Sequence, residues 1–386
     1  MRLIRPLAYQ LALVAVVAVV VGDSRAYAGW AQVDRFLVNG STFDITSDGS
    51  GGVWVTTSRT AGNSLVHITS TGRRAELAVP ETFFYPGDVD VGSDGTVWFV
   101  ADLFVVARVS PVGELAVLPL DFPSEPVGIA ARVGGGAWVT MHESGSVAEI
   151  AADGSLGRIL NLGTEAWPLG IVSTSDGGAW VADLLNSQIH RIASDGGVSV
   201  YSTSSGSRYL AADGQDGAWY TLPDEGILGR IAADGTIEED LVAGPNDMIS
   251  DVSVGADGSV WFTEMYGGRI SRIDPAGHKV SVLLGGCPWR VAANPDGTAW
   301  VTDVFDILAL VTIRGAGVCP GDCAETDSTS ISEVIVCVGM VLGTNVKHCA
   351  ACDTDGDGSV NVTDLIATVA SAVGGCATLS APIDPS

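Results

Sequence analysis

Basic residues are scarce in this chain of 386 residues. Lys and Arg together number 19, against 45 Asp and Glu, and the formal net charge is −26. A surface with this charge repels phosphate backbones, so nucleic acid is not an expected partner. Charged residues make up only 17% of the chain and hydrophobic residues 47%, which is enough apolar material for a core and excludes wholesale disorder.

Long hydrophobic runs are absent except near the N-terminus, where Leu11 to Val21 is unbroken. This run is shorter than the roughly 20 residues that a membrane-spanning helix needs. Arg2 and Arg5 precede the run, and Ala26-Tyr27-Ala28 follows it as a cleavage site for signal peptidase. The pattern predicts a signal peptide over residues 1–28 and a secreted protein, extracellular or periplasmic, with no membrane span.

A cassette marked by a tryptophan occurs seven times at nearly even spacing along the chain. The seven positions are Trp54, Trp98, Trp138, Trp180, Trp219, Trp261 and Trp300. The repeat length, about 40 residues, is typical of the blades of a β-propeller. We expect each tryptophan to pack between neighbouring blades.

Each cassette predicts four short strands. In the sixth copy these are Asp251–Val254, the strand around Trp261, Ile270–Ile273 and Lys279–Leu283. An Asp-Gly pair precedes the tryptophan in five copies and suits a hairpin turn, because Gly tolerates positive φ and Asp bonds to its own backbone. The pairs are Asp94-Gly95, Asp176-Gly177, Asp216-Gly217, Asp257-Gly258 and Asp296-Gly297.

The last cassette lacks a fourth strand before Cys319, whereas an alternating segment, 31–38, precedes the first cassette. We expect this segment to complete the seventh blade and close the ring, which removes exposed sheet edges. The sequence therefore predicts an all-β fold, a seven-bladed β-propeller over residues 29–314.

A different module follows the linker 315–318. Six of the seven cysteines lie in the predicted module 319–386, together with the loop Asp353–Asp364. Acids stand at positions 1, 3, 5 and 12 of this loop and Gly358 at position 6, which is the spacing of an EF-hand calcium loop. The expected calcium ligands are Asp353, Asp355, Asp357, Asp364, the backbone carbonyl of Ser359, and Asn361 directly or through water.

A second frame, Asp322–Glu333, keeps only its first and last ligands, and we expect it to retain a helix and to contribute little calcium binding. Disulfides are the expected state of the cysteines in the motifs Cys319–Cys323 and Cys349–Cys352 of a small exported module, with a zinc site as the alternative. The pairing of the six tail cysteines stays open. Cys287, alone in the last blade, is expected to be a free thiol.

The tryptophan strand 261–264 (Trp-Phe-Thr-Glu), followed by residues 268–273 (GRISRI), resembles the blade motif of the streptogramin lyase family, the virginiamycin B lyase-like proteins. The resemblance covers roughly residues 31–313 and implies a seven-bladed propeller. The tail, with its start at Cys319–Cys323 and its loop Asp353–Asp364, resembles a dockerin-like calcium repeat pair. That resemblance implies a small α-helical C-terminal domain with a cohesin-like partner.

The first resemblance also implies a chemistry. Lyases of that family open a cyclic depsipeptide by elimination, using magnesium, acids at the last position of the Trp-Phe-Thr-Glu motif and histidines in loops that lead into inner strands. Here the acid position holds Asp183, Glu264 and Asp303, but Thr57, Ala101, Met141 and Leu222 in the other blades. The loops 247–250 and 287–290 carry no histidine, and His142 is the one histidine that follows a tryptophan strand.

A general base must lie within hydrogen-bond reach of its proton, so one histidine without a partner favours a non-catalytic protein. We expect a secreted binding or scaffolding propeller that takes a protein, peptide or glycan ligand and has a calcium-stabilised tail. The alternative is a magnesium-dependent lyase acting on a streptogramin-type cyclic peptide or a polysaccharide. Its candidate site residues are His142, Asp183, Glu264 and Asp303.

Overall fold

The computed structural model describes residues 26–28, 31–38, 40–59, 62–79, 85–163, 165–244, 246–303 and 307–313. Residues 1–25 of the predicted signal peptide lie outside this part of the chain. The entire predicted C-terminal module also lies outside it, including the calcium loop, the helices and the six tail cysteines.

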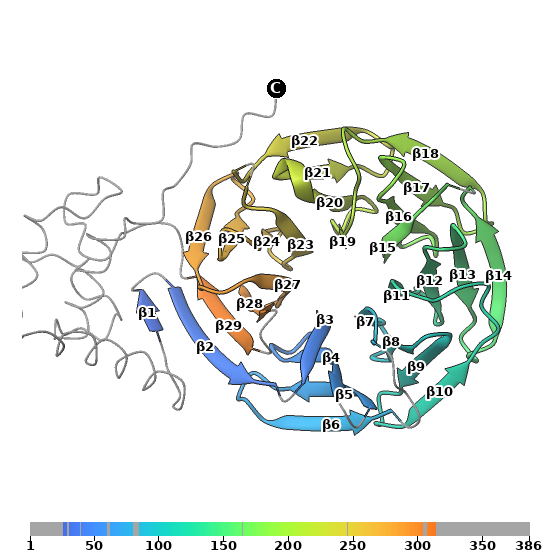
Figure 1. Ribbon diagram of the computed structural model, residues 1–386, viewed down its shortest axis with the longest axis horizontal. Helices are drawn as coiled ribbons and strands as arrows, with labels where there is room; N and C mark the ends of the chain where they lie inside the picture. The colour runs from blue at the N-terminus through green and yellow to red at the C-terminus, as the bar shows by residue number, and fades with distance from the viewer. Residues whose placement is uncertain are drawn as a thin grey trace, which may run out of the picture.

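The described residues form seven antiparallel sheets arranged as blades around a central axis (Figure 1). Innermost are β3 (Ser41–Ser47), β7 (Val89–Val91), β11 (Ile129–Ala131), β15 (Pro168–Ser173), β19 (Leu210–Ala212), β23 (Ile249–Val254) and β27 (Pro288–Ala293). The second strands, which carry the cassette tryptophans, are β4 (Val53–Arg59), β8 (Val97–Asp102), β12 (Ala137–Met141), β16 (Ala179–Asp183), β20 (Ala218–Leu222), β24 (Val260–Glu264) and β28 (Thr298–Asp303).

The outer half of each blade follows in chain order. The third strands are β5 (Gly62–Ile68), β9 (Val105–Val109), β13 (Ser146–Ile150), β17 (Gln188–Ile192), β21 (Ile227–Ile231), β25 (Arg269–Ile273) and β29 (Ile307–Ile313). The fourth strands of the first six blades are β6 (Arg74–Ala78), β10 (Leu115–Pro119), β14 (Leu156–Asn161), β18 (Val198–Ser202), β22 (Ile237–Leu241) and β26 (Lys279–Leu283). A single 3₁₀ turn, Pro223–Glu225, precedes β21 in the described chain. The seven-bladed all-β prediction is confirmed.

The N-terminal segment closes the ring as predicted. Strand β2 (Ala31–Leu37) pairs antiparallel with β29 along its whole length, from Ala31 opposite Ile313 to Leu37 opposite Ile307. In Figure 1 the blue β2 lies beside the orange β29, so the two ends of the propeller share one blade. A short strand β1 (Ala26–Ala28) pairs with the other side of β2. Those three residues were assigned to the end of the signal peptide.

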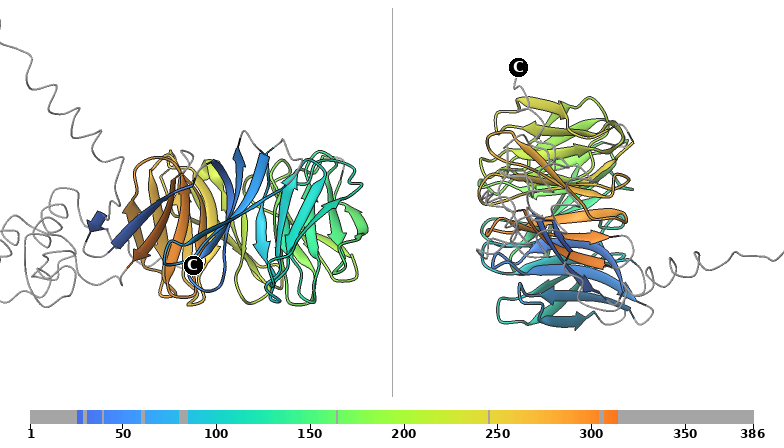
Figure 2. Two further views of the ribbon diagram at one scale, coloured as in Figure 1. Left: turned by 90° about the horizontal axis from the view of Figure 1, so that it is seen from below. Right: turned by 90° about the vertical axis from the view of Figure 1, so that its left-hand side faces the viewer.

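The antiparallel order gives the disc two different faces, which Figure 2 shows from the side. Ile249, at the start of β23, lies opposite Glu264, at the end of β24. The loops that lead into inner strands therefore share one face, the loop face, with the connections between second and third strands. The short glycine turns between first and second strands lie on the opposite face, the turn face.

The glycine turns follow the expected chemistry in four of the five Asp-Gly pairs. Gly95, Gly177, Gly258 and Gly297 all have φ close to +80°. The fifth pair differs because it stands one residue nearer its tryptophan. In that blade Gly214 (φ 76°) and Asp216 (φ 63°) take the left-handed conformation instead of Gly217. The expectation that Gly217 supplies the positive φ was wrong.

The cassette tryptophans pack between blades, as predicted. Trp138, Trp180, Trp261 and Trp300 are fully buried. Three indoles also donate Nε1–H bonds to the next blade's turn: Trp138 to Gly177 O (3.3 Å), Trp180 to Asp216 O (2.8 Å) and Trp300 to Gly51 O (3.0 Å). The last of these contacts crosses the closure from the seventh blade to the first.

The described residues include no helix long and apolar enough to cross a membrane. Cys287 is partly buried and forms no disulfide in this part of the chain.

Removing β2 should destabilise the whole propeller. A chain starting at residue 38 leaves β29 with an unpaired edge, and we expect its Tm to fall by about 5 °C or more relative to the full chain. The measurement is thermal unfolding followed by far-UV circular dichroism. A chain starting at residue 29 is the control, because it loses only β1. Equal Tm values for the two truncated chains would show that β2 does not close the ring.

Candidate functional site

One residue from each blade stands at the loop-face end of the inner strand, where the seven strands come closest to the axis. In five blades its backbone N–H donates to the threonine two residues after the cassette tryptophan, as from Asp44 to Thr56 and from Arg290 to Thr302, both 3.1 Å. These seven residues, the central ring, are Asp44, Asp88, Gly128, Gly170, Tyr209, Asp251 and Arg290.

The inner strands are irregular at this level. The pairing register shifts between Thr42 and Asp44 in β3 and between Pro288 and Val291 in β27, and β15 and β23 shift at the same place. A β-bulge bends the strand and changes the direction of its side chains. Charged residues of otherwise apolar strands thereby reach the channel instead of the packing between blades.

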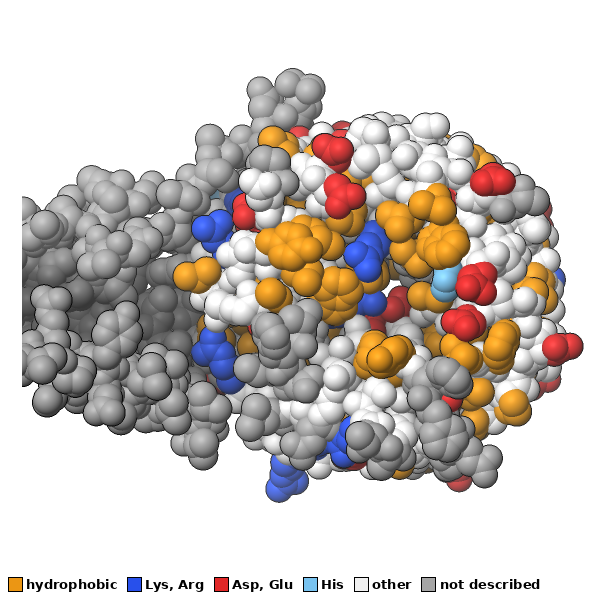
Figure 3. All heavy atoms as spheres, viewed as in Figure 1, with side chains coloured by type: hydrophobic (Ala, Val, Ile, Leu, Met, Phe, Trp, Pro, Cys, Tyr) orange, Lys and Arg blue, Asp and Glu red, His pale blue; other side chains and the backbone are white. Residues whose placement is uncertain are grey.

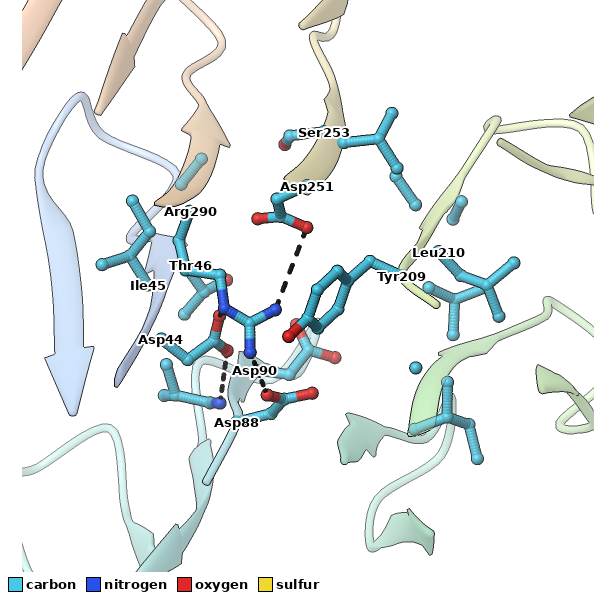
Figure 4. A pocket seen from close by; sticks show the side chains of 18 of the residues that line it. Asp44, Ile45, Thr46, Asp88, Asp90, Tyr209, Leu210, Asp251, Ser253 and Arg290 are labelled. Atoms are coloured by element: carbon cyan, nitrogen blue, oxygen red, sulfur yellow. Dashed lines mark hydrogen bonds and ion pairs between the residues drawn. The ribbon is translucent and has the colours of Figure 1, made fainter. Parts of the chain in front are cut away.

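Arg290 lies at the centre of this ring (Figure 4). Its Nη2 is 2.9 Å from Asp88 Oδ1, its Nε is 3.4 Å from Asp44 Oδ1, and its Nη1 is 4.0 Å from Asp251 Oδ1. Nε also donates to the carbonyl of Phe43 at 3.1 Å. The guanidinium carbon is 3.8 Å from the ring centroid of Tyr209, which is cation–π distance. Residues from five blades are thus joined through one buried side chain.

The buried carboxyl groups near the axis outnumber the guanidinium groups that lie close to them. Burial raises the pKa of Asp251 to about 6, although Arg290 acts in the opposite direction. Burial also raises the pKa of Asp44 and of Asp88. Two residues after Asp88, burial raises the pKa of Asp90 to about 6. Burial lowers the pKa of Arg290, but Tyr209 and the carboxylates outweigh this effect, so the guanidinium stays charged.

The central carboxylates also join neighbouring blades. Asp44 Oδ2 accepts the N–H of Val89 at 2.8 Å, and Asp251 Oδ2 accepts the N–H of Val291 at 2.9 Å. Asp90 Oδ2 bonds the N–H of Ala131 in the same way at 2.8 Å. Beyond the ring, toward the turn face, the inner strands line a cavity of about 440 Å³. The carboxylates near the axis therefore join neighbouring blades as well as line this cavity.

The three acids expected from the sequence each bond within their own blade. Asp183 accepts the N–H of Trp167 at 2.9 Å and lies 3.2 Å from Nε2 of His190. Burial opposes the shift, but hydrogen bonds from His190, Trp167 and Asn186 hold the pKa of Asp183 below its usual value. Here the carboxylate fixes the loop that leads into the fourth inner strand.

Glu264 and Asp303 have similar local partners. Glu264 is 1% exposed and accepts from Lys279 Nζ at 2.8 Å and from Ser271 Oγ at 2.5 Å. Asp303 accepts the N–H of Cys287 at 2.9 Å. No group of three or more His, Cys, Asp or Glu side chains in the described chain is placed to hold a metal ion. Asp183 and Glu264 bond to groups of their own blades, and among the described residues the three acids do not come together as a magnesium site.

His142 is the histidine of the described chain that stands in a loop of the loop face. Its ring lies 4.4 Å from that of Trp167, and Nδ1 is buried with no hydrogen-bond partner in the described structure. Burial lowers the pKa of His142, so the imidazole is neutral at pH 7. By contrast, His67, His190 and His278 pair with Asp48, Asp183 and Asp274 inside blades or turns.

The loop face carries exposed hydrophobic side chains. Tyr85 (75% exposed), Phe104 (44%), Leu185 (64%) and Tyr266 (67%) all lie in its loops. The face seen in Figure 3 has hydrophobic side chains and a basic side chain around the central hollow, with a histidine and acidic side chains beside it. Exposed hydrophobic groups around a hollow are typical of a surface that binds a ligand with apolar groups.

Comparison with known proteins agrees with this architecture. The family described as the Virginiamycin B lyase family matches residues 32–203 and 160–316. The chain belongs to this family. A curated relative, virginiamycin B lyase of Nocardia farcinica (strain IFM 10152), is 30% identical over 107 residues, which are 28% of this chain and 37% of that protein. The chain thus matches little more than a third of that relative's length.

Solved structures show the same fold. A streptogramin B lyase structure is 23% identical with a TM-score of 0.69, covering 75% of this chain and 100% of that one. Virginiamycin B lyase from Staphylococcus aureus is 23% identical with a TM-score of 0.67, covering 73% of this chain and 99% of that one. The catalytically inactive form of that enzyme, in which a histidine is replaced by alanine, was solved with quinupristin and is 22% identical with a TM-score of 0.67.

Within this family member, sequence reasoning identified His142 and the three acids but missed the central ring. The available signal was a charged or aromatic residue at the start of an apolar inner strand, as at Arg290 and Tyr209. Glycine holds the equivalent position in two other blades for a steric reason. A Cβ on Gly128 would collide with the Leu169 carbonyl, and one on Gly170 would lie 2.7 Å from the Arg208 carbonyl.

Arg290→Met should destabilise the propeller by about 3–5 kcal/mol at pH 8, because it leaves buried carboxylates without their cation. The central carboxyls have folded pKa values above their unfolded ones. Their stabilising contribution is therefore present below pH 4 and is lost as the pH rises through about 6. Without Arg290 those pKa values rise further, so the defect should be smaller at pH 5 than at pH 8.

Urea unfolding of the full chain and the variant at both pH values measures this difference. Arg73→Met, at an exposed turn, is the control and should cost less than about 0.5 kcal/mol at either pH. A defect for Arg290→Met that is independent of pH would contradict the electrostatic explanation.

Proposed function

We propose that this propeller is a binding module that takes a peptide-class ligand with apolar or aromatic groups on its loop face. The observation that carries the proposal is that the three candidate acids already have hydrogen-bond partners near them in the chain. Asp183, Glu264 and Asp303 are bonded within single blades, so they are not free to act together on a substrate. Exposed Tyr85, Leu185 and Tyr266 supply contact area on the same face.

A second candidate function, a lyase, rests on His142 and on family membership. A histidine is essential in the Staphylococcus aureus enzyme whose His-to-Ala form is inactive. His142 is neutral at pH 7 and partly exposed, as a general base requires, but its unpartnered Nδ1 is buried. It lacks a partnering histidine among the described residues of the loop face, which is why we favour binding over catalysis.

Quinupristin separates the two functions. We expect the full chain, with Mg²⁺, to bind quinupristin in a calorimetric titration without opening it, as followed by mass spectrometry. Leu185→Glu should weaken binding by about tenfold, because it places a charge on the apolar contact surface. Val133→Glu, on an exposed apolar residue of the turn face, is the matched control and should have no effect.

Ring opening by the wild type that is lost in His142→Ala would establish the lyase and overturn the binding proposal. Absence of both binding and opening would show that the ligand is of another class, such as the glycan or folded protein that the sequence also allows.

For the C-terminal module we propose calcium binding by Asp353, Asp355, Asp357, Ser359, Asn361 and Asp364, in a secreted protein whose tail cysteines form disulfides. The support is the spacing of the loop and the export signal in the sequence. A dockerin-like module of this kind would attach the propeller to a cohesin-like partner, and the propeller would then present its loop face as a scaffolded binding unit.

Calcium titration of the full chain by calorimetry should give one strong site. Asp355→Ala removes a central carboxylate and should weaken that site by about tenfold or more. Asp322→Ala, in the degenerate loop, should leave the affinity unchanged and is the control. A stoichiometry near two would show that the Asp322–Glu333 loop also binds calcium, and an unchanged affinity in Asp355→Ala would place the site elsewhere.

A further inference from the structure

Arg208 stands at the mouth of the central channel, one residue before Tyr209 of the ring. Its backbone is fixed on both sides, since its N–H donates to Thr221 O at 3.1 Å and its carbonyl accepts from Gly170 N at 2.9 Å. The guanidinium carbon lies 5.1 Å from the ring centroid of Tyr209 and 5.1 Å from that of Trp289. Two aromatic rings from different blades therefore hold this side chain in place.

The guanidinium has no acceptor in the described structure. Its Nε is buried and makes no hydrogen bond, and no carboxylate of the described chain lies within ion-pair distance of it. The residue as a whole is only half-buried, so the two Nη groups reach solvent. Asp88 lies close enough for Arg208 to lower its pKa, but Asp88 Oδ1 is occupied by Arg290.

A guanidinium without an acceptor is unusual among the described arginines. All but one of the remaining described arginines contact a carboxylate or a carbonyl, as Arg230 does with Asp213 at 2.8 Å and Arg35 does with Leu284 O at 2.8 Å. The exception is Arg73, which is exposed in a turn. In a protein of net charge −26, a fixed and unpaired guanidinium beside two half-buried aromatic rings is left free for an external acceptor.

We propose that Arg208 binds the carboxylate of the ligand, whose neighbouring apolar or aromatic group packs on the loop face. Two Nη groups in one plane match the two oxygens of a carboxylate. Contact with the rings of Tyr209 and Trp289 restrains the guanidinium in advance, which lowers the entropy cost of binding. This inference rests on the proposed binding function and adds the chemical class of the ligand.

The test uses 3-phenylpropionate and its neutral amide as probes, titrated into the full chain and followed by saturation-transfer NMR. Wild type should bind the acid more tightly than the amide. Arg208→Gln should weaken binding of the acid by about tenfold, the loss expected from removing a hydrogen bond to a charged group. Its affinity for the amide should be unchanged. Arg208→Lys keeps the charge without the planar fork and should recover part of the affinity.

Arg73→Gln removes the same charge at an unpartnered exposed site and should bind the acid as wild type does. The inference is overturned if Arg208→Gln binds the acid as well as wild type does, if Arg73→Gln loses as much, or if wild type prefers the amide. A titration with quinupristin tells failure of the Arg208 contact from failure of the binding function. If Arg208→Gln binds both 3-phenylpropionate and quinupristin as wild type does, the binding module is retained and Arg208 is rejected as its anion contact.

Discussion

A propeller closes into a ring only when the two ends of its chain share one blade. In this protein that constraint falls on β2 and β29, which are separated by nearly the whole propeller in sequence and lie opposite each other from Ala31 to Leu37. The pairing brings the first blade against the seventh, where the Trp300 indole bonds to Gly51 O. The channel, the ring of residues around it and the order of loops on the loop face all require this closure.

The centre of the ring shows how a propeller handles charge. Carboxylates on inner strands accept backbone N–H groups of the next blade, so they are part of the assembly while they also line the central cavity. Arg290 is the guanidinium that pairs with them, and its guanidinium carbon lies 3.8 Å from the ring centroid of Tyr209. Burial raises the pKa of Asp44 and Asp251, Arg290 acts in the opposite direction, and the charge of the neighbouring carboxylates adds to the rise. Buried carboxylates beside an arginine could suggest an active site, but in this protein they hold the blades together.

Membership of the virginiamycin B lyase family therefore establishes architecture more firmly than activity. The acid position of the repeated motif is retained in three blades, but each carboxylate stabilises its own blade, as Asp183 does through Trp167 and His190. Among the described residues, the loop face carries His142, exposed aromatic and aliphatic groups, and the unpaired guanidinium of Arg208. The proposed recognition of an apolar, anionic ligand is based on these groups.

The sequence by itself determined the number of blades, the four strands in each, the closure by residues 31–37 and the burial of the cassette tryptophans. These features depend on local periodicity, which recurs from cassette to cassette and can be read without contacts. It also identified His142 and the acid position, because a motif marks both. The sequence-based expectation of a positive φ at Gly217 was wrong. The Asp216-Gly217 pair stands one residue nearer its tryptophan than the other pairs, and Gly214 and Asp216 take the positive φ instead.

Only the tertiary structure decided what the polar residues do. Arg290, Asp44, Asp88 and Asp251 come from blades at opposite ends of the sequence, and closing the ring is what places them around one axis. Arg208 and Trp289 likewise lie in different blades, so neither spacing nor motif predicts their contact. Sequence patterns specify strands because strand formation is local, whereas the pairing or freedom of a charge depends on neighbours that folding brings from other blades.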